Sequence, residues 1–164
     1  MAENQFVLFD GEERSSLLPF TYTRAISDIR IGILKIHEKW DLYFNQNCFI
    51  FSHQNLQLKY PFTAQSNMIF INASVLPETS LIESITKLPL GHSLVSESGK
   101  IIALHPDQHV STLNHLHILS KTSPKVIFNS PYTSITYPWD IFTHNGAQIQ
   151  SDVKLMKLEP NGHL

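Results

Sequence analysis

The chain has only one cysteine among its 164 residues, Cys48, which excludes an internal disulfide and a cluster of thiolate metal ligands. Sparse cysteine is typical of proteins from a reducing compartment, so we expect a cytoplasmic location. The apolar residues Phe49, Ile50 and Phe51 follow Cys48 directly. We therefore interpret this thiol as a buried structural group rather than as a nucleophile.

Long apolar runs and an excess of one charge are also missing. No stretch approaches the roughly 20 apolar residues that a membrane-spanning helix needs. The early apolar run Phe6–Phe9 is preceded by Glu3 and not by lysine or arginine, unlike a secretion signal. The net charge of -2 argues against general nucleic-acid binding. We therefore expect no membrane or nucleic-acid partner. We also expect one soluble domain, since a chain of this length buries roughly 70% of its unfolded surface.

Short apolar runs bounded by turn residues alternate with segments of helical periodicity. This alternation predicts an α/β domain with a mainly parallel sheet flanked by helices. We predict strands at 5–9, 48–51, 68–71, 94–95, 101–104 and 126–128, and helices at 26–43, 77–88, 106–120 and 138–145. Ser98-Gly99 predicts a hairpin turn between the fourth and fifth strands, because glycine supplies the positive φ that such turns require.

The helix predicted at 26–43 has one apolar face, because its apolar residues recur at three- and four-residue steps. The residues expected to face the sheet are Ile29, Ile33, Ile36, Trp40 and Tyr43. Those expected to face outward are Lys35, Lys39 and Asp41. Gly32 interrupts the pattern, so the alternative that the helix begins only there stays open.

The histidines and serines give little support for a metal site or for a nucleophilic site. His105 and His109 are four residues apart, a spacing at which two histidines of one helix share a metal. Pro106 places His105 just outside the helix, and no third ligand has a recognisable spacing, so we predict no metal site here. No G-x-S-x-G segment is present, which leaves nucleophilic hydrolysis without specific support.

The most informative segment joins the first strand to the first helix, where all three arginines lie. Open α/β sheets bind ligands at the carboxyl ends of their strands. Hydroxyl and bidentate guanidinium contacts to phosphate are available from Thr21, Thr23, Arg24 and Arg30. The sequence therefore predicts an anion site in this segment. The alternative is that the two later arginines pair with Asp28 and Glu38 on a solvated surface.

These residues also carry a family resemblance. Leu18-Pro-Phe-Thr-Tyr-Thr-Arg24 resembles the Leu-x-Pro-Leu-Thr segment that follows the glycine-rich signature of sugar nucleotidyltransferases. The chain is most similar to a divergent bacterial branch, whose first domain resembles the uridylyltransferase half of the bifunctional N-acetylglucosamine-1-phosphate enzyme. The shared traits are Phe9-Asp10, the block from Leu18 to Trp40, the turn from Ile71 to Pro77, and Pro138-Trp-Asp-Ile-Phe142 with Asn145. The similarity covers nearly the whole chain.

The resemblance implies a Rossmann-like nucleotidyltransferase domain, abbreviated relative to the usual one. Such a domain joins a sugar 1-phosphate to a nucleoside triphosphate and releases pyrophosphate, with magnesium as the cofactor. This in-line transfer depends on positioning and charge neutralisation rather than on a protein nucleophile. By position, the implied catalytic residues are Arg24 and Arg30, which hold phosphates. The implied substrate-binding residues are Arg14, Thr21, Thr23 and Asn72.

Several features depart from the family's pattern. The loop after the first strand has one glycine, Gly11, in place of a glycine-rich cradle, and Glu12 and Glu13 would repel a triphosphate. Ala25 stands where the family has a lysine, and Asn72 begins the turn that carries the family's metal-binding aspartate. Two hypotheses therefore stay open. One is an active transferase, and the other is a catalytically inactive module that binds a sugar phosphate or nucleotide and assists assembly.

In the resembling branch, the Pro138–Phe142 segment leads into a left-handed parallel β-helix with hexapeptide, acyltransferase-like repeats. We therefore divide the chain into a nucleotidyltransferase-like domain, residues 1–147, and an extended or disordered tail, residues 148–164, that leads into a missing β-helix domain. A domain cut from such a neighbour exposes apolar surface. We expect this surface near Trp139 and Phe142, and with it self-association into a homo-oligomer.

Overall fold

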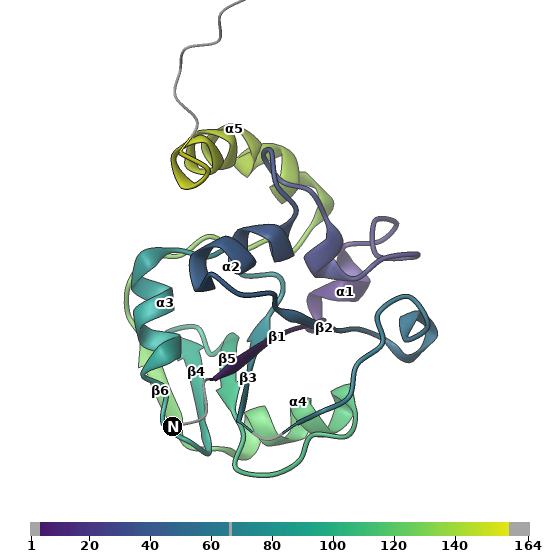
Figure 1. The fold of residues 1–164 in the computed structure, drawn as a ribbon, viewed down its shortest axis with the longest axis vertical. Coiled ribbons are helices and arrows are strands. Elements are labelled where there is room, and N and C mark those ends of the chain that lie inside the picture. Colours follow the sequence, from purple (N-terminus) through teal and green to yellow (C-terminus); the bar gives the residue numbers. More distant parts are fainter. Residues whose placement is uncertain (1–3, 66, 158–164) are drawn as a thin grey trace, which may run out of the picture.

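The computed structural model describes residues 4–65 and 67–157, which form a six-stranded sheet with helices on both faces (Figure 1). The strands are β1 (Gln5–Phe9), β2 (Phe49–Phe51), β3 (Met68–Asn72), β4 (His92–Ser96), β5 (Ile101–His105) and β6 (Lys125–Phe128). The helices are α1 (Glu13–Ser16), α2 (Ile36–Phe44), α3 (Thr79–Thr86), α4 (Leu113–Thr122) and α5 (Pro138–Leu155), with short 3-10 turns η1 (Ile26–Asp28) and η2 (Gln54–Leu56).

The sheet has the strand order β2-β1-β3-β5-β4-β6. Within the described ranges, β5 is the one strand that runs antiparallel to its neighbours, which confirms the expected mainly parallel α/β sheet. β1 and β3 pair in parallel from Gln5 opposite Met68 to Phe9 opposite Asn72. Their carboxyl ends therefore meet at one edge of the sheet, the edge at which such sheets bind ligands.

The hairpin predicted at Ser98-Gly99 is confirmed and lies at this same edge. β4 and β5 pair antiparallel, and Gly99 has a φ of +85°. The amide of Gly99 donates a hydrogen bond of 2.9 Å to the carbonyl of Ser96. Because β4 is parallel to β3, the hairpin that follows β4 is close to the carboxyl ends of β1 and β3.

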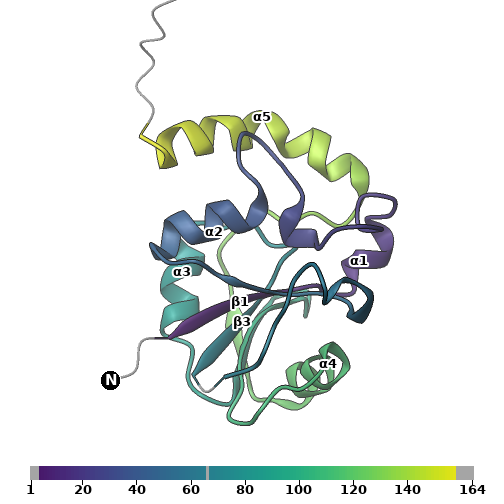
Figure 2. The same ribbon diagram turned by 45° about the vertical axis from the view of Figure 1, so that its right-hand side comes forward.

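Alternate residues of β1 supply the two faces of the core. Phe6 and Leu8 pack into the cluster that contains Trp40 of α2. Val7 and Phe9 pack on the opposite face, in the cluster that contains Leu116 of α4. Figures 1 and 2 show α2 and α3 on one side of the sheet and α4 on the other, with α5 outside α2. In the described ranges, we find no helix that combines the length and the apolar character needed to cross a membrane.

The helix predicted at 26–43 is wrong in its first half. Residues 26–28 form η1, and α2 begins only at Ile36. Between them the chain turns at Gly32, which has a φ of +78°, and a bridge between Arg30 and Lys35 closes the turn. The helical spacing of the isoleucines arises because both short pieces bury their apolar residues in the same core.

The burial predicted for α2 and the segment before it is confirmed in part. Ile29, Ile36 and Trp40 are buried as expected, whereas Ile33 and Tyr43 are half-buried, as are Lys35 and Asp41. Lys39 was expected to face outward, and this is wrong. Its side chain is buried because its ammonium group pairs with Asp152 of α5, which a periodicity argument within one helix does not detect.

The boundaries of two later helices also differ from the prediction. α4 starts at Leu113, seven residues later than predicted, where the Thr112 hydroxyl accepts a hydrogen bond from the His115 amide. α5 does not stop at Gly146 but continues to Leu155, so the extended structure expected from residue 148 is wrong for 148–155. One glycine inside a helix costs only about 1 kcal/mol, which the contacts of Asp152 offset. Residues 158–164 of the expected tail lie outside the described residues, and the domain division stays a prediction.

Candidate functional site

A cavity of about 360 Å³ opens where β1 and β3 end. Its walls come from the loop after β1, the β4–β5 hairpin, α4 and the start of β6. The lining residues are Phe9, Gly11, Glu12, Glu13, Asn72, Ser98, Gly99, Lys100, Ile101, His117, Ser120, Lys121 and Lys125. The cavity therefore lies at the strand ends where the order of the sheet brings the first and third strands together.

Asn72 is fixed at the floor of this cavity. Its side-chain amide donates to the Ile101 carbonyl at 3.0 Å and to the Glu13 carboxylate at 3.4 Å, and its oxygen accepts from the Ser74 amide at 3.0 Å. Gly11 passes directly over it, because a Cβ built on Gly11 would lie 2.9 Å from the Asn72 amide nitrogen. A larger residue at position 11 would therefore displace the side chains of Asn72 and Glu13.

Charged side chains of both signs surround Asn72. The ammonium nitrogen of Lys100 is buried and lies 2.9 Å from a Glu13 carboxylate oxygen. Lys121 and Glu12 form a more exposed pair at 3.2 Å, and Lys125 adds a further positive charge. The cavity thus has one positive charge more than it has negative charges. Each carboxylate that lines it is already neutralised by a lysine.

His117 contributes a neutral ring to the cavity wall. Burial lowers the pKa of His117 below its ordinary value, and the nearby charges of Glu12 and Lys121 act in opposite directions. Its ring also contacts Phe9 edge-on, with ring centroids 5.9 Å apart. At neutral pH the imidazole is therefore uncharged, and it offers a hydrogen bond rather than a positive charge to a ligand.

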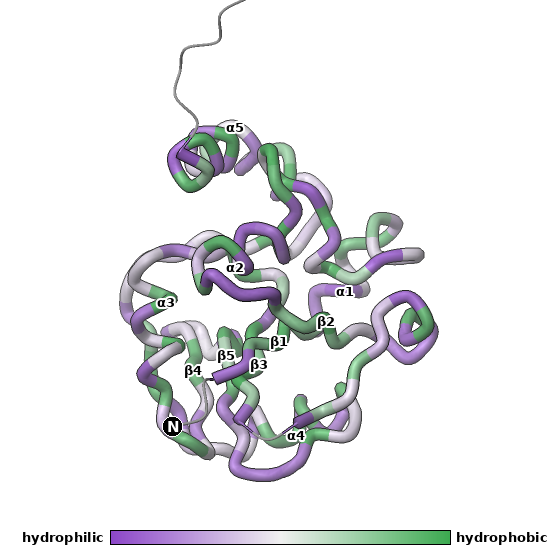
Figure 3. The backbone as a smooth tube through the Cα atoms, viewed as in Figure 1, coloured by the Kyte–Doolittle hydropathy of each residue, from purple (hydrophilic) through white to green (hydrophobic). Residues whose placement is uncertain are grey.

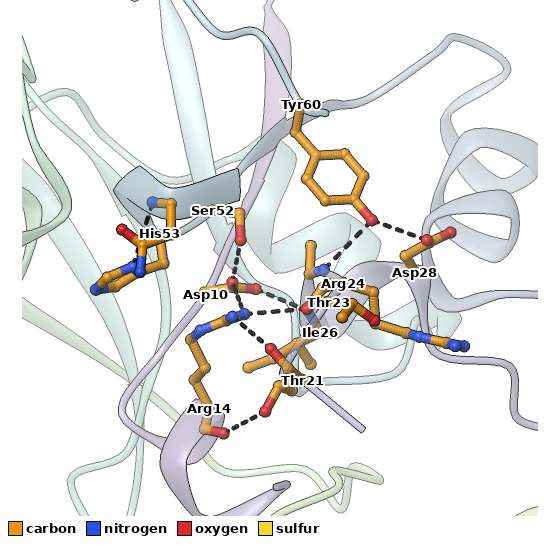
Figure 4. Close-up of polar contacts among 12 residues, drawn as sticks. Asp10, Arg14, Thr21, Thr23, Arg24, Ile26, Asp28, Ser52, His53 and Tyr60 are labelled. Carbon is orange, nitrogen blue, oxygen red and sulfur yellow. Dashed lines mark hydrogen bonds and ion pairs between the residues drawn. The ribbon is translucent and has the colours of Figure 1, made fainter. Parts of the chain in front are cut away.

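Arg14 and Thr21, predicted as substrate-binding residues, brace the loop beside the cavity (Figure 4). The Arg14 guanidinium donates to an Asp10 carboxylate oxygen at 2.8 Å, to the Arg24 carbonyl at 3.1 Å and to the Thr21 carbonyl. The Thr21 hydroxyl donates back to the Arg14 carbonyl at 2.7 Å. These contacts fix the long loop between β1 and α2 against the end of β1.

Asp10 is at the centre of this hydrogen-bond network. It accepts hydrogen bonds from the Ile26 amide at 2.8 Å, from the Ser52 hydroxyl and from Arg14. Burial raises the pKa of the Asp10 carboxyl, and these hydrogen bonds and the Arg14 charge oppose that rise. All three partners hold backbone segments in place, so Asp10 does not extend toward the cavity as a ligand.

The other predicted residues are not brought together at the cavity. Thr23, Arg24 and Arg30 are exposed, and the Arg24 side chain extends away from Asp10 (Figure 4). The Arg30 guanidinium donates to the Ile33 carbonyl of its own turn. Of the six predicted site residues, Asn72 alone lines the cavity. The assignment of Arg24 and Arg30 to phosphate stays a prediction.

Sequence reasoning missed the three lysines of the cavity. One signal was available, because Lys100 directly follows the Ser98-Gly99 turn that was correctly predicted. Lys121 and Lys125 flank the end of α4, and no local pattern in the sequence places them beside β1. The cluster exists only because the hairpin and α4 fold over the same strand ends.

The family resemblance implies magnesium as the cofactor of this site. Among residues 4–65 and 67–157, no group of three or more histidine, cysteine, aspartate or glutamate side chains is placed to hold a metal ion. Magnesium binds best to carboxylates and phosphates in octahedral geometry, yet Glu12 and Glu13 each have a lysine partner. The side chains present therefore do not fit a protein-bound magnesium ion.

The Asp28 carboxylate predicts a pH dependence of stability. Burial alone would raise its pKa, but hydrogen bonds from Lys35 at 2.7 Å and Tyr60 at 2.8 Å, with the charge of Lys59, lower the pKa below its ordinary value of 3.8. A lowered pKa gives stability that is present above the unfolded-state pKa and lost as pH falls through the folded-state pKa.

We therefore expect the Asp28→Asn variant to be less stable than the unchanged protein at neutral pH. The difference should shrink as pH falls below about 4, because the unfolded state protonates the carboxyl first and the folded state follows at its lowered pKa. Urea denaturation at a series of pH values measures it. A difference that stays constant down to acid pH would show that the charge of Asp28 is not what stabilises this loop.

Comparison with protein families gives one match, to the model of a family described as sugar nucleotidyl transferase, over residues 6–160. Comparison with curated proteins gives no match. The family match runs from β1 to beyond α5 and so includes every wall of the cavity. By that match, the chain belongs to the sugar nucleotidyl transferase family.

Proposed function

We propose that the cavity at the ends of β1 and β3 binds the phosphate groups of a nucleoside triphosphate and a sugar 1-phosphate, and that the domain joins the two. A phosphate oxygen of the sugar 1-phosphate forms a bond to the α-phosphorus of the triphosphate. The bond from that phosphorus to the oxygen bridging toward the β-phosphorus breaks, and pyrophosphate leaves. No protein nucleophile takes part.

The observation that carries this proposal is the lysine cluster. Lys100, Lys121 and Lys125 converge on one cavity at the sheet edge where α/β folds bind ligands. Lysine is a compact positive charge suited to phosphate, and its attraction is stronger at a partly buried position. A phosphate that enters the cavity competes with Glu13 for Lys100, so Glu13 holds the lysine in place until the ligand arrives.

A second candidate function, a binding module without catalysis, is favoured by a different observation. The carboxylates at the cavity are paired with lysines, and the side chains do not form a magnesium site. Transfer between two anions depends on neutralising the charge that gathers on the transferred phosphoryl group. If the lysines alone do not provide enough neutralisation, the domain binds its ligands and does not join them.

Calorimetric titration with nucleoside triphosphates and sugar 1-phosphates, with and without magnesium, tests the binding site. We expect Lys100→Met to weaken phosphate-ligand affinity by roughly 10- to 100-fold, since a hydrogen bond to a charged group contributes about 1.5–3 kcal/mol. Lys87→Met is the matched control, because Lys87 is exposed at the end of α3 and outside the cavity. It should leave affinity unchanged.

The arginine hypothesis is tested in the same titration. Replacement of both Arg24 and Arg30 with alanine leaves affinity unchanged if the cavity is the anion site. A large loss in that double variant, with none in Lys100→Met, would move the site to the 21–30 loop. Release of pyrophosphate from a triphosphate and a sugar 1-phosphate then separates the two functions. Tight binding without pyrophosphate release would leave the module without catalysis as the function.

A further inference from the structure

The last helix, α5, packs against the protein through Ile141, which is buried in the core, and through two polar side chains. The Asn145 side chain accepts a hydrogen bond of 2.8 Å from the Gly32 amide. The Asp152 carboxylate accepts from the Ile33 amide at 2.8 Å and from the Leu34 amide at 3.1 Å, and it pairs with buried Lys39. These contacts determine which side of α5 faces inward.

A second side of α5 carries exposed apolar side chains. Trp139 is 61% exposed, Phe142 73%, Ile149 40% and Met156 36%. Figure 3 shows hydrophobic segments along α5, which lies at the outer boundary of the molecule. A surface helix normally turns its large apolar side chains to the core, so the exposed ones on α5 mark a surface that a partner could cover.

The exposed residues follow a regular pattern. Together with Gly146 and half-buried Val153, they occupy positions 139, 142, 146, 149, 153 and 156. The steps between these positions alternate between three and four, which is the spacing of the contact positions in a pair of packed helices. A Cβ added at Gly146 would meet nothing within 4 Å, so the stripe is open at its centre. We name these six residues the α5 stripe.

The α5 stripe is symmetrical about a point between residues 147 and 148. An antiparallel copy centred there places Trp139 opposite Met156, Phe142 opposite Val153 and Gly146 opposite Ile149. Each large side chain then faces a smaller one, and Ile149 fills the space that glycine leaves. A parallel copy would place Gly146 opposite Gly146 and leave a gap in the middle of the contact. Antiparallel pairing therefore packs this stripe better.

We infer that the α5 stripe is the interface for a second copy of this chain, with the two α5 helices packed antiparallel across a two-fold axis. Such a contact is self-complementary, as homodimer interfaces with two-fold symmetry are. Figures 1 and 2 both place the loop of residues 17–24 beside the first turn of α5, and Leu18, Phe20 and Tyr22 of that loop are exposed. That loop widens the contact beyond a single helix.

Sedimentation or light scattering over a range of concentrations tests the pairing. We expect a dimer to form as the concentration rises through the micromolar range. Phe142→Glu should weaken it roughly a hundredfold, because a large exposed aromatic that an interface buries is a typical hot spot. Leu58→Glu is the matched control, since Leu58 is fully exposed and far from α5 in sequence, and it should not change the dimer.

Tryptophan fluorescence provides a second measurement on the unchanged protein. Of the two tryptophans, Trp40 is buried and Trp139 is exposed, so a shift of emission with concentration reports on Trp139. We expect the emission to move to shorter wavelength as the dimer forms. The Phe142→Glu variant should keep the same far-ultraviolet circular dichroism while it loses this shift.

Spin labels on single cysteines of α5 test the orientation. The labels are introduced in a Cys48→Ser background, so that the native thiol does not compete for the label. In an antiparallel dimer, labels at Gln150 lie close together, whereas labels at Lys154 are offset along the axis by about 20 Å, given a rise of 1.5 Å per residue. A parallel dimer would give similar label distances at both positions and would overturn the antiparallel pairing.

A strict monomer at the highest attainable concentration would overturn the inference and assign the stripe to a different partner. So would a dimer that Phe142→Glu leaves intact. Neither result bears on the cavity, because no residue of the α5 stripe lines it.

Discussion

Replacement of Asp152 with alanine is expected to lower the free energy of unfolding by about 3–5 kcal/mol, the range seen when one partner of a buried ion pair is removed. The Asp152 side chain is 1% exposed, and its loss leaves the Lys39 ammonium buried without a counter-charge. The amides of Ile33 and Leu34 lose their acceptor as well. Urea denaturation followed by circular dichroism measures the change.

A double variant separates the charge from the hydrogen bonds. Lys39→Met combined with Asp152→Leu removes both charges, so it should be more stable than Asp152→Ala alone. It should still be less stable than the unchanged protein, because the two backbone amides remain unpaired. Gln150→Ala, at an exposed position of the same helix, should change stability by less than about 0.5 kcal/mol. An Asp152→Ala variant as stable as this control would mean that the ion pair does not hold α5.

The same contacts give a structural explanation for the Arg30-Ile-Gly-Ile33 segment. Gly32 has a φ of +78°, and a Cβ there would lie 2.9 Å from the backbone of Gln148. The segment is therefore shaped to receive α5, with its amides directed at Asn145 and Asp152. The segment that contains Arg30, a residue predicted to hold phosphate, thus also docks a helix that lies more than a hundred residues later.

Much of the fold was predictable because its signals are local. The strands are short apolar runs between turn residues, and the hairpin is marked by one glycine with positive φ. The errors have a different origin. Periodicity predicts that Lys39 lies on a solvent-exposed helix face. Its burial is favourable only because it pairs with Asp152, which is distant in the sequence. The continuation of α5 past Gly146 depends on the same long-range contact.

The candidate site was predictable only in part, for a related reason. Asn72 follows a buried strand, and the rule that ligands bind at strand ends identifies it. Arg14 and Thr21 belong to the segment between β1 and α2, as predicted, yet their hydrogen bonds go to each other and to Asp10 instead of into the cavity. Lys100, Lys121 and Lys125 belong to three separate elements. Their convergence follows from the order of the strands, which periodicity does not reveal.

Trp40→Ala is the second variant with a large expected effect. The indole is completely buried between α2 and the sheet and stacks on Phe44 with ring centroids 5.5 Å apart. Its removal leaves a cavity the size of the ring, which costs about 3–5 kcal/mol. Urea denaturation should show this loss. A cost below about 1 kcal/mol would mean that the core collapses around the missing ring.

Trp40→Phe distinguishes packing from hydrogen bonding. The indole N–H donates to the Val75 carbonyl at 3.1 Å, and Val75 follows the turn that begins at Asn72. Phenylalanine keeps most of the apolar contact but leaves that buried carbonyl without this donor, at a cost of about 1–3 kcal/mol. Because the same turn positions Asn72 in the cavity, Trp40→Phe should also weaken phosphate-ligand binding. Ile36→Val, a loss of one buried methyl group on the same helix, is the control that should leave binding unchanged. Equal affinities in the two variants would show that α2 supports the core alone and not the cavity.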